Sequence, residues 1–76
     1  MAAIHQSQLF EYVQAHKEFA ITWIKESGQK VFIPRACVTS FFSSGLTMNI
    51  KSLNSNEILK VNRLTVIEID GMEVFQ

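Results

Sequence analysis

Apolar residues recur at every second position over most of the chain after Phe19, and this spacing limits the possible folds more than any other feature. Phe19, Ile21 and Trp23 share one face of an extended segment, and segment 46–51 alternates three apolar with three polar residues. Successive side chains of a strand point to opposite faces, so a period of two is typical of half-buried strands in an antiparallel sheet. The chain after Phe19 is therefore predicted to form a sheet.

Turn-forming residues divide this part of the chain into short strands. The predicted turns lie at 27–28, 43–45, 54–56 and 70–71. Asp70-Gly71 is the clearest of them, because a type I′ hairpin turn needs two residues that tolerate positive φ. Pro34 lacks a backbone N–H, which predicts a strand end or an edge at this position. The predicted strands are 19–26, 30–33, 36–42 (with a helical turn after Pro34 as the alternative), 46–51, 58–61, 64–69 and 72–75.

Residues 7–17 are predicted to form one amphipathic helix before the sheet. Leu9, Phe10 and Val13 fall on one face at helical spacing. Ser7 is placed to cap the first turn, and Lys17 lies where the helix dipole favours a cation. A helix this short needs a sheet to pack against.

These elements together indicate an α+β, mainly β fold in a single domain, residues 1–76. An N-terminal helix (7–17) is followed by an antiparallel β meander or barrel (19–75). Five to seven short strands at this spacing predict a small, strongly bent antiparallel sheet or an SH3-like, partly open barrel, with the helix covering one end. Edge strands in so small a sheet favour pairing with another chain.

The chain is short for a domain that has no disulfide or structural metal ion to stabilise it. A chain of 76 residues buries only about 60% of the surface that it exposes when unfolded. Its single cysteine excludes an intramolecular disulfide and a multi-thiolate zinc site. Six Phe, one Trp and one Tyr allow either dense packing or a subunit interface. We therefore expect a homo-oligomer.

The first residues and the longest uncharged segment were compared with the patterns of signal peptides and membrane spans. The first residues lack a basic start followed by an apolar run, and the uncharged segment 36–50 is interrupted by polar residues. These features differ from those of a signal peptide and of a membrane span. Together with a free thiol they predict a cytoplasmic protein that does not associate with membranes. The formal net charge of zero removes any bulk attraction to nucleic acid or anionic lipid.

Residues that carry enzymatic or metal chemistry are few and scattered. His5 and His16 would lie about 16 Å apart along a continuous helix, too far to share a metal ion. Cys37 has no sequence neighbour that would activate its thiol. Asp70 is the sole Asp, and its position before Gly71 is typical of a turn. The glycines are too widely separated for a phosphate-binding loop. We expect a non-enzymatic protein without a metal, a cofactor or a small-molecule substrate.

Basic residues are concentrated in the middle of the chain, where they interleave with aromatic ones. Residues 17–63 hold all seven basic residues and three acidic ones, which gives a net charge of +4 (seven minus three). Clusters of this kind are used by proteins to bind other proteins or nucleic acids. The candidate binding residues are Trp23, Lys25, Lys30, Arg35, Phe41, Phe42, Lys51, Lys60 and Arg63.

Two hypotheses account for these residues. The first is a small protein-interaction module, a regulatory or inhibitory subunit that binds another protein and itself. Trp23, Phe41 and Phe42 would be its anchors, because buried aromatic residues carry much of the energy of an interface. Arg35 would be its main polar contact. The alternative is a dimeric or ring-forming nucleic-acid-binding regulator with a basic, aromatic-bearing sheet face that contacts phosphates and stacks on bases.

Two motifs in segment 28–50 add to the second hypothesis. They are Val31-Phe32-Ile33-Pro34-Arg35 and Gly45-Leu46-Thr47-Met48-Asn49-Ile50. This segment, less than a third of the chain, resembles the swapped-hairpin AbrB-type DNA-binding family, which has a strand ending in Ile-Pro-Lys/Arg and a later Gly-x-x-Leu-x-Ile. The family's Leu-Gly-Ile is replaced by Phe41-Phe42-Ser43, and residues 7–26 have no counterpart. The resemblance implies binding to DNA.

Overall fold

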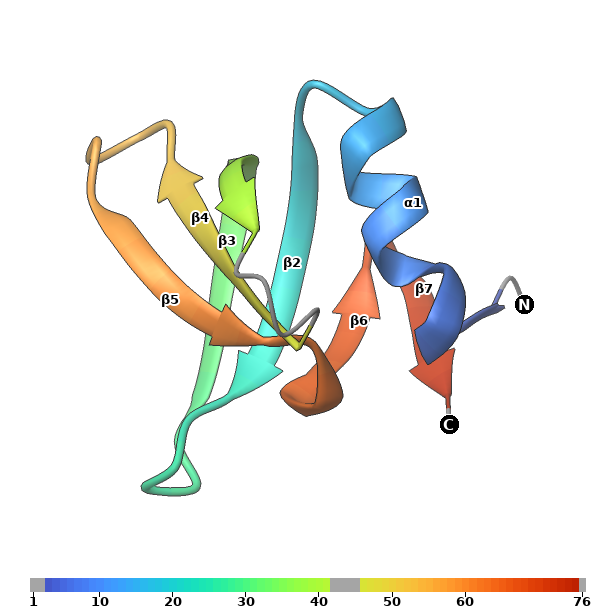
Figure 1. Ribbon diagram of the computed structural model, residues 1–76. Helices are drawn as coiled ribbons and strands as arrows, with labels where there is room; N and C mark the ends of the chain where they lie inside the picture. Colours follow the sequence, from blue (N-terminus) through green and yellow to red (C-terminus); the bar gives the residue numbers. More distant parts are fainter. Residues whose placement is uncertain (1–2, 42–45, 76) are drawn as a thin grey trace.

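The computed structural model describes residues 3–41 and 46–75, and within this part of the chain one short α-helix packs against a seven-stranded sheet (Figure 1). Two 3-10 helices, η1 and η2, complete the secondary structure of these residues. The elements in chain order are β1 (Ala3–His5), η1 (Gln6–Gln8), α1 (Leu9–Ala15), β2 (Phe19–Ile24), β3 (Lys30–Phe41), β4 (Thr47–Ser52), β5 (Ile58–Asn62), η2 (Arg63–Thr65), β6 (Val66–Ile69) and β7 (Met72–Phe75).

The sheet has the strand order β1-β7-β6-β2-β3-β4-β5. It is strongly bent but does not close into a barrel, because β1 and β5 end this order without pairing with each other. The predicted α+β, mainly β fold with a strongly bent sheet is confirmed. The sheet is mixed rather than antiparallel throughout, since β1, which the sequence did not predict, pairs with β7 in parallel.

The long strand β3, which lies between β2 and β4, corrects the prediction of a strand end or an edge at Pro34. Phe19 of β2 pairs with Ala36, and Ile21 pairs with Ile33, so β3 has one residue more than β2 between these two pairs. Pro34 lies in this β-bulge, where a residue is left out of the ladder and a missing N–H is tolerated. The strand therefore continues to Phe41, which confirms the strand preferred for residues 36–42 as far as the described residues reach. Residue 42 and the predicted turn at 43–45 lie outside the described residues.

The helix is shorter than the predicted 7–17. His5, at the end of β1, takes the capping role expected of Ser7: its Nδ1 accepts the Ser7 N–H at 3.1 Å, which places Ser7 inside η1. The backbone becomes extended at His16, so Lys17 lies beyond the helix. The apolar face is as predicted, since Leu9 and Val13 are fully buried.

The last predicted long strand, 64–69, is also shorter. Asn62 ends β5, and its side chain accepts the N–H of Leu64 at 2.9 Å. The carbonyl of Asn62 accepts the hydroxyl of Thr65 at 2.7 Å. These two bonds close the 3-10 turn η2, and β6 begins only at Val66. The strands predicted at 58–61 and 72–75 are present as β5 and β7.

The core lies between the inner face of the bent sheet and α1. Its burial follows the predicted alternation in β4, where Met48 and Ile50 are fully buried. Leu46 departs from that pattern because it precedes β4 and is 38% exposed. No helix within residues 3–41 and 46–75 has the length and apolarity that a membrane crossing requires. The largest fully buried side chains are Leu9, Ile21, Met48, Ile50, Ile69, Val13 and Val61.

Asp70 connects α1 and β2 to the hairpin formed by β6 and β7. Asp70 and Gly71 have φ angles of 49° and 79°, as the predicted type I′ turn requires. The Asp70 carboxylate accepts the Ala20 N–H at 2.7 Å and the Tyr12 hydroxyl at 2.5 Å. The Asp70 N–H donates to the Ala20 carbonyl at 2.8 Å. One turn residue thus fixes the position of the helix on the sheet.

Replacing Tyr12 by Phe is expected to lower the free energy of unfolding at pH 7 by about 1 kcal/mol, because a hydrogen bond to a carboxylate is lost. The hydrogen bond to Asp70, burial and the Asp70 charge raise the pKa of Tyr12 from 10.0 to about 12. The folded state therefore binds the Tyr12 hydroxyl proton more tightly than the unfolded chain does. The stabilisation that the hydrogen bond between Tyr12 and Asp70 gives is complete below pH 10 and is lost as the pH rises toward about 12.

Urea unfolding of the wild type and of Tyr12→Phe at several pH values from 7 to 12 checks this expectation. The difference between the two proteins should shrink above pH 10. If the difference in the free energy of unfolding stayed constant up to pH 12, the loss of stability at alkaline pH could not be assigned to Tyr12.

Replacing Gly71 by Ala is expected to cost about 1 kcal/mol, because an L-residue is strained at positive φ. A Cβ at Gly71 would meet nothing within 4 Å, so the cost comes from the backbone and not from a clash. Asn adopts the left-handed conformation more readily, and Gly71→Asn should lose less stability than Gly71→Ala. Thermal unfolding of the three proteins measures this order, and equal losses would argue against a strained turn.

Candidate functional site

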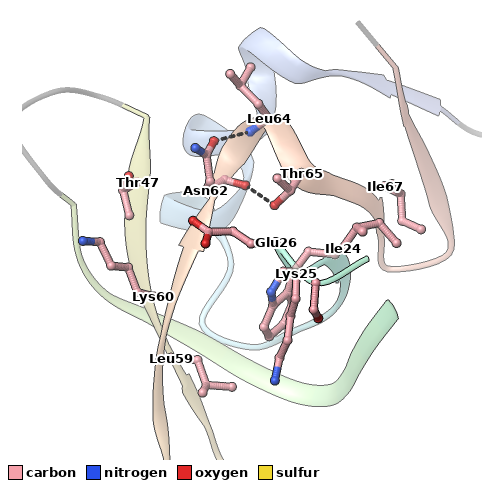
Figure 2. A pocket seen from close by; sticks show the side chains of 12 residues that line it. Ile24, Lys25, Glu26, Thr47, Leu59, Lys60, Asn62, Leu64, Thr65 and Ile67 are labelled. Atoms are coloured by element: carbon pink, nitrogen blue, oxygen red, sulfur yellow. Dashed lines mark hydrogen bonds between the residues drawn. The ribbon is translucent and has the colours of Figure 1, made fainter. Parts of the chain in front are cut away.

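The open sheet leaves a groove between the edge strand β5 and the strands β2 and β6 (Figure 2). Its volume is about 1020 Å³. Residues of η2 and of the turn after β2 also line it. The groove exists because β5 and β6 follow each other in the chain but are not neighbours in the sheet.

Trp23 and Leu59 provide an apolar lining from opposite sides of this groove. Trp23 pairs with Val31 and Val66, which places it in the middle of the inner face, and it is only 3% exposed. Leu59 pairs with the fully buried Ile50, so it also lies on the inner face of the sheet. Leu59 is half-buried, and β5 is the last strand in the sheet order of the described residues.

Leu64 and Ile67 add two exposed apolar side chains to the groove. Leu64 is held in η2 and is 42% exposed. The register of β6 against β2 shifts by one residue between Glu68 and Val66, so Ile67 is the extra residue of a β-bulge. Bulges redirect side chains, and Ile67 is 37% exposed. Large apolar side chains gathered around a hollow are typical of binding surfaces.

Charged residues line the groove at its rim. Lys25 and Glu26 belong to the tight turn after β2, in which the Lys25 N–H donates to the Gln29 carbonyl at 2.9 Å and the Gly28 N–H donates to the Lys25 carbonyl at 2.8 Å. Lys60 comes from β5 (Figure 2). The rim therefore carries two cations and one anion. Three of the residues predicted from the sequence, Trp23, Lys25 and Lys60, meet at this groove.

Phe41 and Arg63 meet elsewhere, beside α1. The Phe41 ring packs on Phe10 with a centroid distance of 4.7 Å. The Arg63 guanidinium carbon lies 5.1 Å from the centroid of the same Phe10 ring. A guanidinium over an aromatic face is attracted electrostatically by the ring. Because Phe10 belongs to α1, its contacts with Arg63 and Phe41 help to hold the helix on the sheet.

The remaining predicted residues are dispersed. Arg35 donates from Nη2 to the Glu18 carboxylate at 2.7 Å, in an ion pair whose side chains are 60% and 50% exposed. Lys30 pairs with Ile24 at the start of β3, and Lys51 lies in β4. Phe42 lies outside the described residues. The nine predicted residues therefore do not form one continuous face in the part of the chain that is described.

The sequence did not point to Leu59, Leu64 and Ile67 as site residues. One signal was present, because Leu64-Thr65-Val66-Ile67 contains three apolar residues in four positions, which is more than strict alternation allows. Such an excess is consistent with an extra residue in a bulge. A sequence alone does not show which of these side chains is redirected to the surface.

The two histidines make contacts with aromatic rings, and the single cysteine lies outside the groove. His16 stacks on Tyr12 with a centroid distance of 4.0 Å, and His5 contacts the edge of Phe75 at 5.1 Å. Cys37 is half-buried. Among the residues that the structure describes, no group of three or more His, Cys, Asp or Glu side chains is arranged to hold a metal ion.

Comparison with known proteins identifies no protein-family model, no curated protein and no solved structure that matches this chain. The structure of this chain also departs from the AbrB-type pattern at the first of the two similar motifs, Val31-Phe32-Ile33-Pro34-Arg35. That family's strand ends at Ile-Pro-Lys/Arg, whereas β3 continues through Pro34 to Phe41. The function is therefore argued from the groove itself.

Trp23 and Leu64 are expected to differ sharply in their importance for stability. Trp23→Ala removes a side chain that is 3% exposed and should cost about 3–5 kcal/mol. Leu64→Ser changes a side chain that is 42% exposed and should cost about 1 kcal/mol or less. Urea unfolding measures both values. Similar losses for the two variants would mean that Leu64 belongs to the core and not to an open surface.

Proposed function

We propose that this chain is a non-enzymatic, cytoplasmic protein-interaction module that binds a partner protein in the groove between β5 and the β2–β6 pair, and acts as a regulatory or inhibitory subunit. The observation that carries the proposal is the position of Leu64 and Ile67. Both are large, apolar and exposed, and both line the same groove as Trp23 and Leu59. Covering such side chains releases water from apolar surface, which drives protein association.

The nucleic-acid alternative has less support. It needs basic residues on one face, because several phosphates have to be contacted together. Arg35 is paired with Glu18, and Arg63 lies over Phe10. Lys25 and Lys60 line the groove, but Glu26 lies beside them. This arrangement favours a protein ligand.

Self-association through the open edge of β5 also has less support than binding of a different protein. If two copies of β5 paired antiparallel over their whole length, Lys60, the central residue of β5, would lie opposite Lys60 of the second copy. Like charges directly opposite each other destabilise a strand pair. This single arrangement is therefore disfavoured, and we propose that the homo-oligomer expected from chain length forms through another surface.

Selection of linear peptides displayed on phage tests the proposed function. Peptides selected on the wild type should bind it with Kd values of about 1–100 µM. Leu64→Asp places a charge in the groove and should weaken binding by about tenfold or more. The matched control is Phe32→Asp, which changes a 59% exposed side chain outside the groove and should leave Kd within about twofold.

Three results would contradict the proposal. The first is that no selected peptide distinguishes Leu64→Asp from the wild type, with circular dichroism confirming that the variant is folded. The second is that Phe32→Asp, and not Leu64→Asp, abolishes binding. The third is tight binding of a 20-nucleotide single strand whose affinity falls steeply between 50 and 200 mM salt, because that dependence is typical of phosphate contacts.

A further inference from the structure

The indole N–H of Trp23 has no acceptor in the part of the chain that the structure describes. Trp23 is 3% exposed, and no hydrogen bond among residues 3–41 and 46–75 includes its Nε1. A buried Trp usually has a hydrogen-bond partner for this group. Among these residues, Arg63 Nε is the side-chain atom that is both fully enclosed and unpartnered, so the Trp23 N–H is not enclosed in the core. It therefore reaches the surface as a free donor.

The groove is the place where this donor becomes accessible. Trp23 lies on the inner face of β2, where Val31 and Val66 flank it on the neighbouring strands. The part of Trp23 that is not buried lines the groove between β5 and the β2–β6 pair. The free N–H is thus directed into the groove, where ligand atoms would lie. A ligand acceptor there would gain a hydrogen bond without breaking one within the protein.

Several acceptors in the groove are already occupied (Figure 2). The Asn62 side chain accepts the Leu64 N–H at 2.9 Å, and the Asn62 carbonyl accepts the Thr65 hydroxyl at 2.7 Å. The Lys25 carbonyl accepts a backbone N–H of its own turn at 2.8 Å. The Glu26 carboxylate lies at the rim. A ligand that buries many backbone N–H groups here would leave some of them unpaired, which costs free energy.

A proline-rich segment satisfies both conditions. Proline has no backbone N–H, so it brings no donor that would be buried without a partner. In the polyproline II conformation the backbone carbonyls have no internal hydrogen bonds and can accept from a protein donor. The proline rings are apolar and fit the walls that Leu59, Leu64 and Ile67 form. The conformation is also preformed, which lowers the entropy lost on binding.

We infer that the ligand of the groove is a proline-rich segment of the partner protein, and that one of its backbone carbonyls accepts the indole N–H of Trp23. This inference rests on the proposed function and specifies what the partner presents. Trp23 then has two roles, because its ring is part of the core and its N–H selects the ligand. Leu64 and Ile67 supply apolar contact, whereas the N–H fixes the position of the ligand backbone.

The free protein tests the first step of this inference. Trp23 is the only Trp of the chain, so nitrogen–proton correlation spectra contain a single indole signal. Without an acceptor inside the protein, this N–H should exchange within minutes of dilution into heavy water at pH 7, well before the backbone amide of the fully buried Ile50. An indole N–H that is protected as long as the Ile50 amide would already be bonded, which would overturn the inference.

The binding test uses acetyl-hexaproline-dimethylamide, which adopts polyproline II and has carbonyls but no backbone N–H. Titration with this peptide should move the indole proton signal downfield and saturate with a Kd of about 0.1–1 mM. The matched peptide repeats Gly-Ser three times between the same end groups. It has as many residues but is flexible and carries N–H groups, so it should bind about fivefold more weakly or not at all.

Removal of the indole N–H separates hydrogen bonding from apolar packing. Growth with 3-benzothienylalanine replaces Trp23 by a side chain of nearly the same shape that has sulfur in place of the N–H. This replacement should weaken hexaproline binding about fivefold, since one hydrogen bond is lost. The matched control, Tyr12→Phe, removes an O–H donor from an aromatic side chain outside the groove and should leave Kd within about twofold. Circular dichroism confirms that both proteins are folded.

The inference fails if hexaproline leaves the indole signal unmoved, if the Gly-Ser peptide binds as tightly, or if the sulfur analogue binds hexaproline as well as the wild type does. The proposed function is judged separately, with the phage-selected peptides. Selected peptides that depend on Leu64 but lack proline and leave the indole signal unmoved would preserve protein binding and reject this mode of recognition. When no selected peptide depends on Leu64, the proposed function itself fails.

Discussion

The strand β3 belongs to two ladders at once, and the rest of the structure depends on its bend. Ala36, in the middle of β3, pairs with Phe19 of β2 on one side and with Ser52 of β4 on the other. Extra residues on β3, around Pro34 and at Thr39, increase the local twist of this strand. A flat sheet would leave its apolar face open to water. The bend instead carries β4 and β5 round, so that β5 and β2 line the same groove.

The groove stays open because β6 already has two partners. β6 pairs with β2 and β7, so neither of its edges is available to β5, although η2 is the only connection between the two strands. The Asp70 carboxylate holds this arrangement, since it ties the β6–β7 turn to both β2 and α1. The contacts that stabilise one side of the sheet therefore leave β5 at the other end of the strand order that the described residues form. This links the stability of the fold to the availability of the candidate site.

Patterns within single strands could be predicted from the sequence, whereas the register between strands could not. Alternation predicted β2 and β4, and the turn signals beside them predicted β5 and β7, because both kinds of signal lie in the local sequence. The positions of Pro34 and Ile67 depend on how many residues their partner strands contribute, and neither sequence segment contains that information. β1 has only three residues and pairs with the opposite end of the chain, so it has no local periodicity. The groove was predicted only in part for the same reason: Leu64 and Ile67 reach it through a 3-10 turn and a bulge.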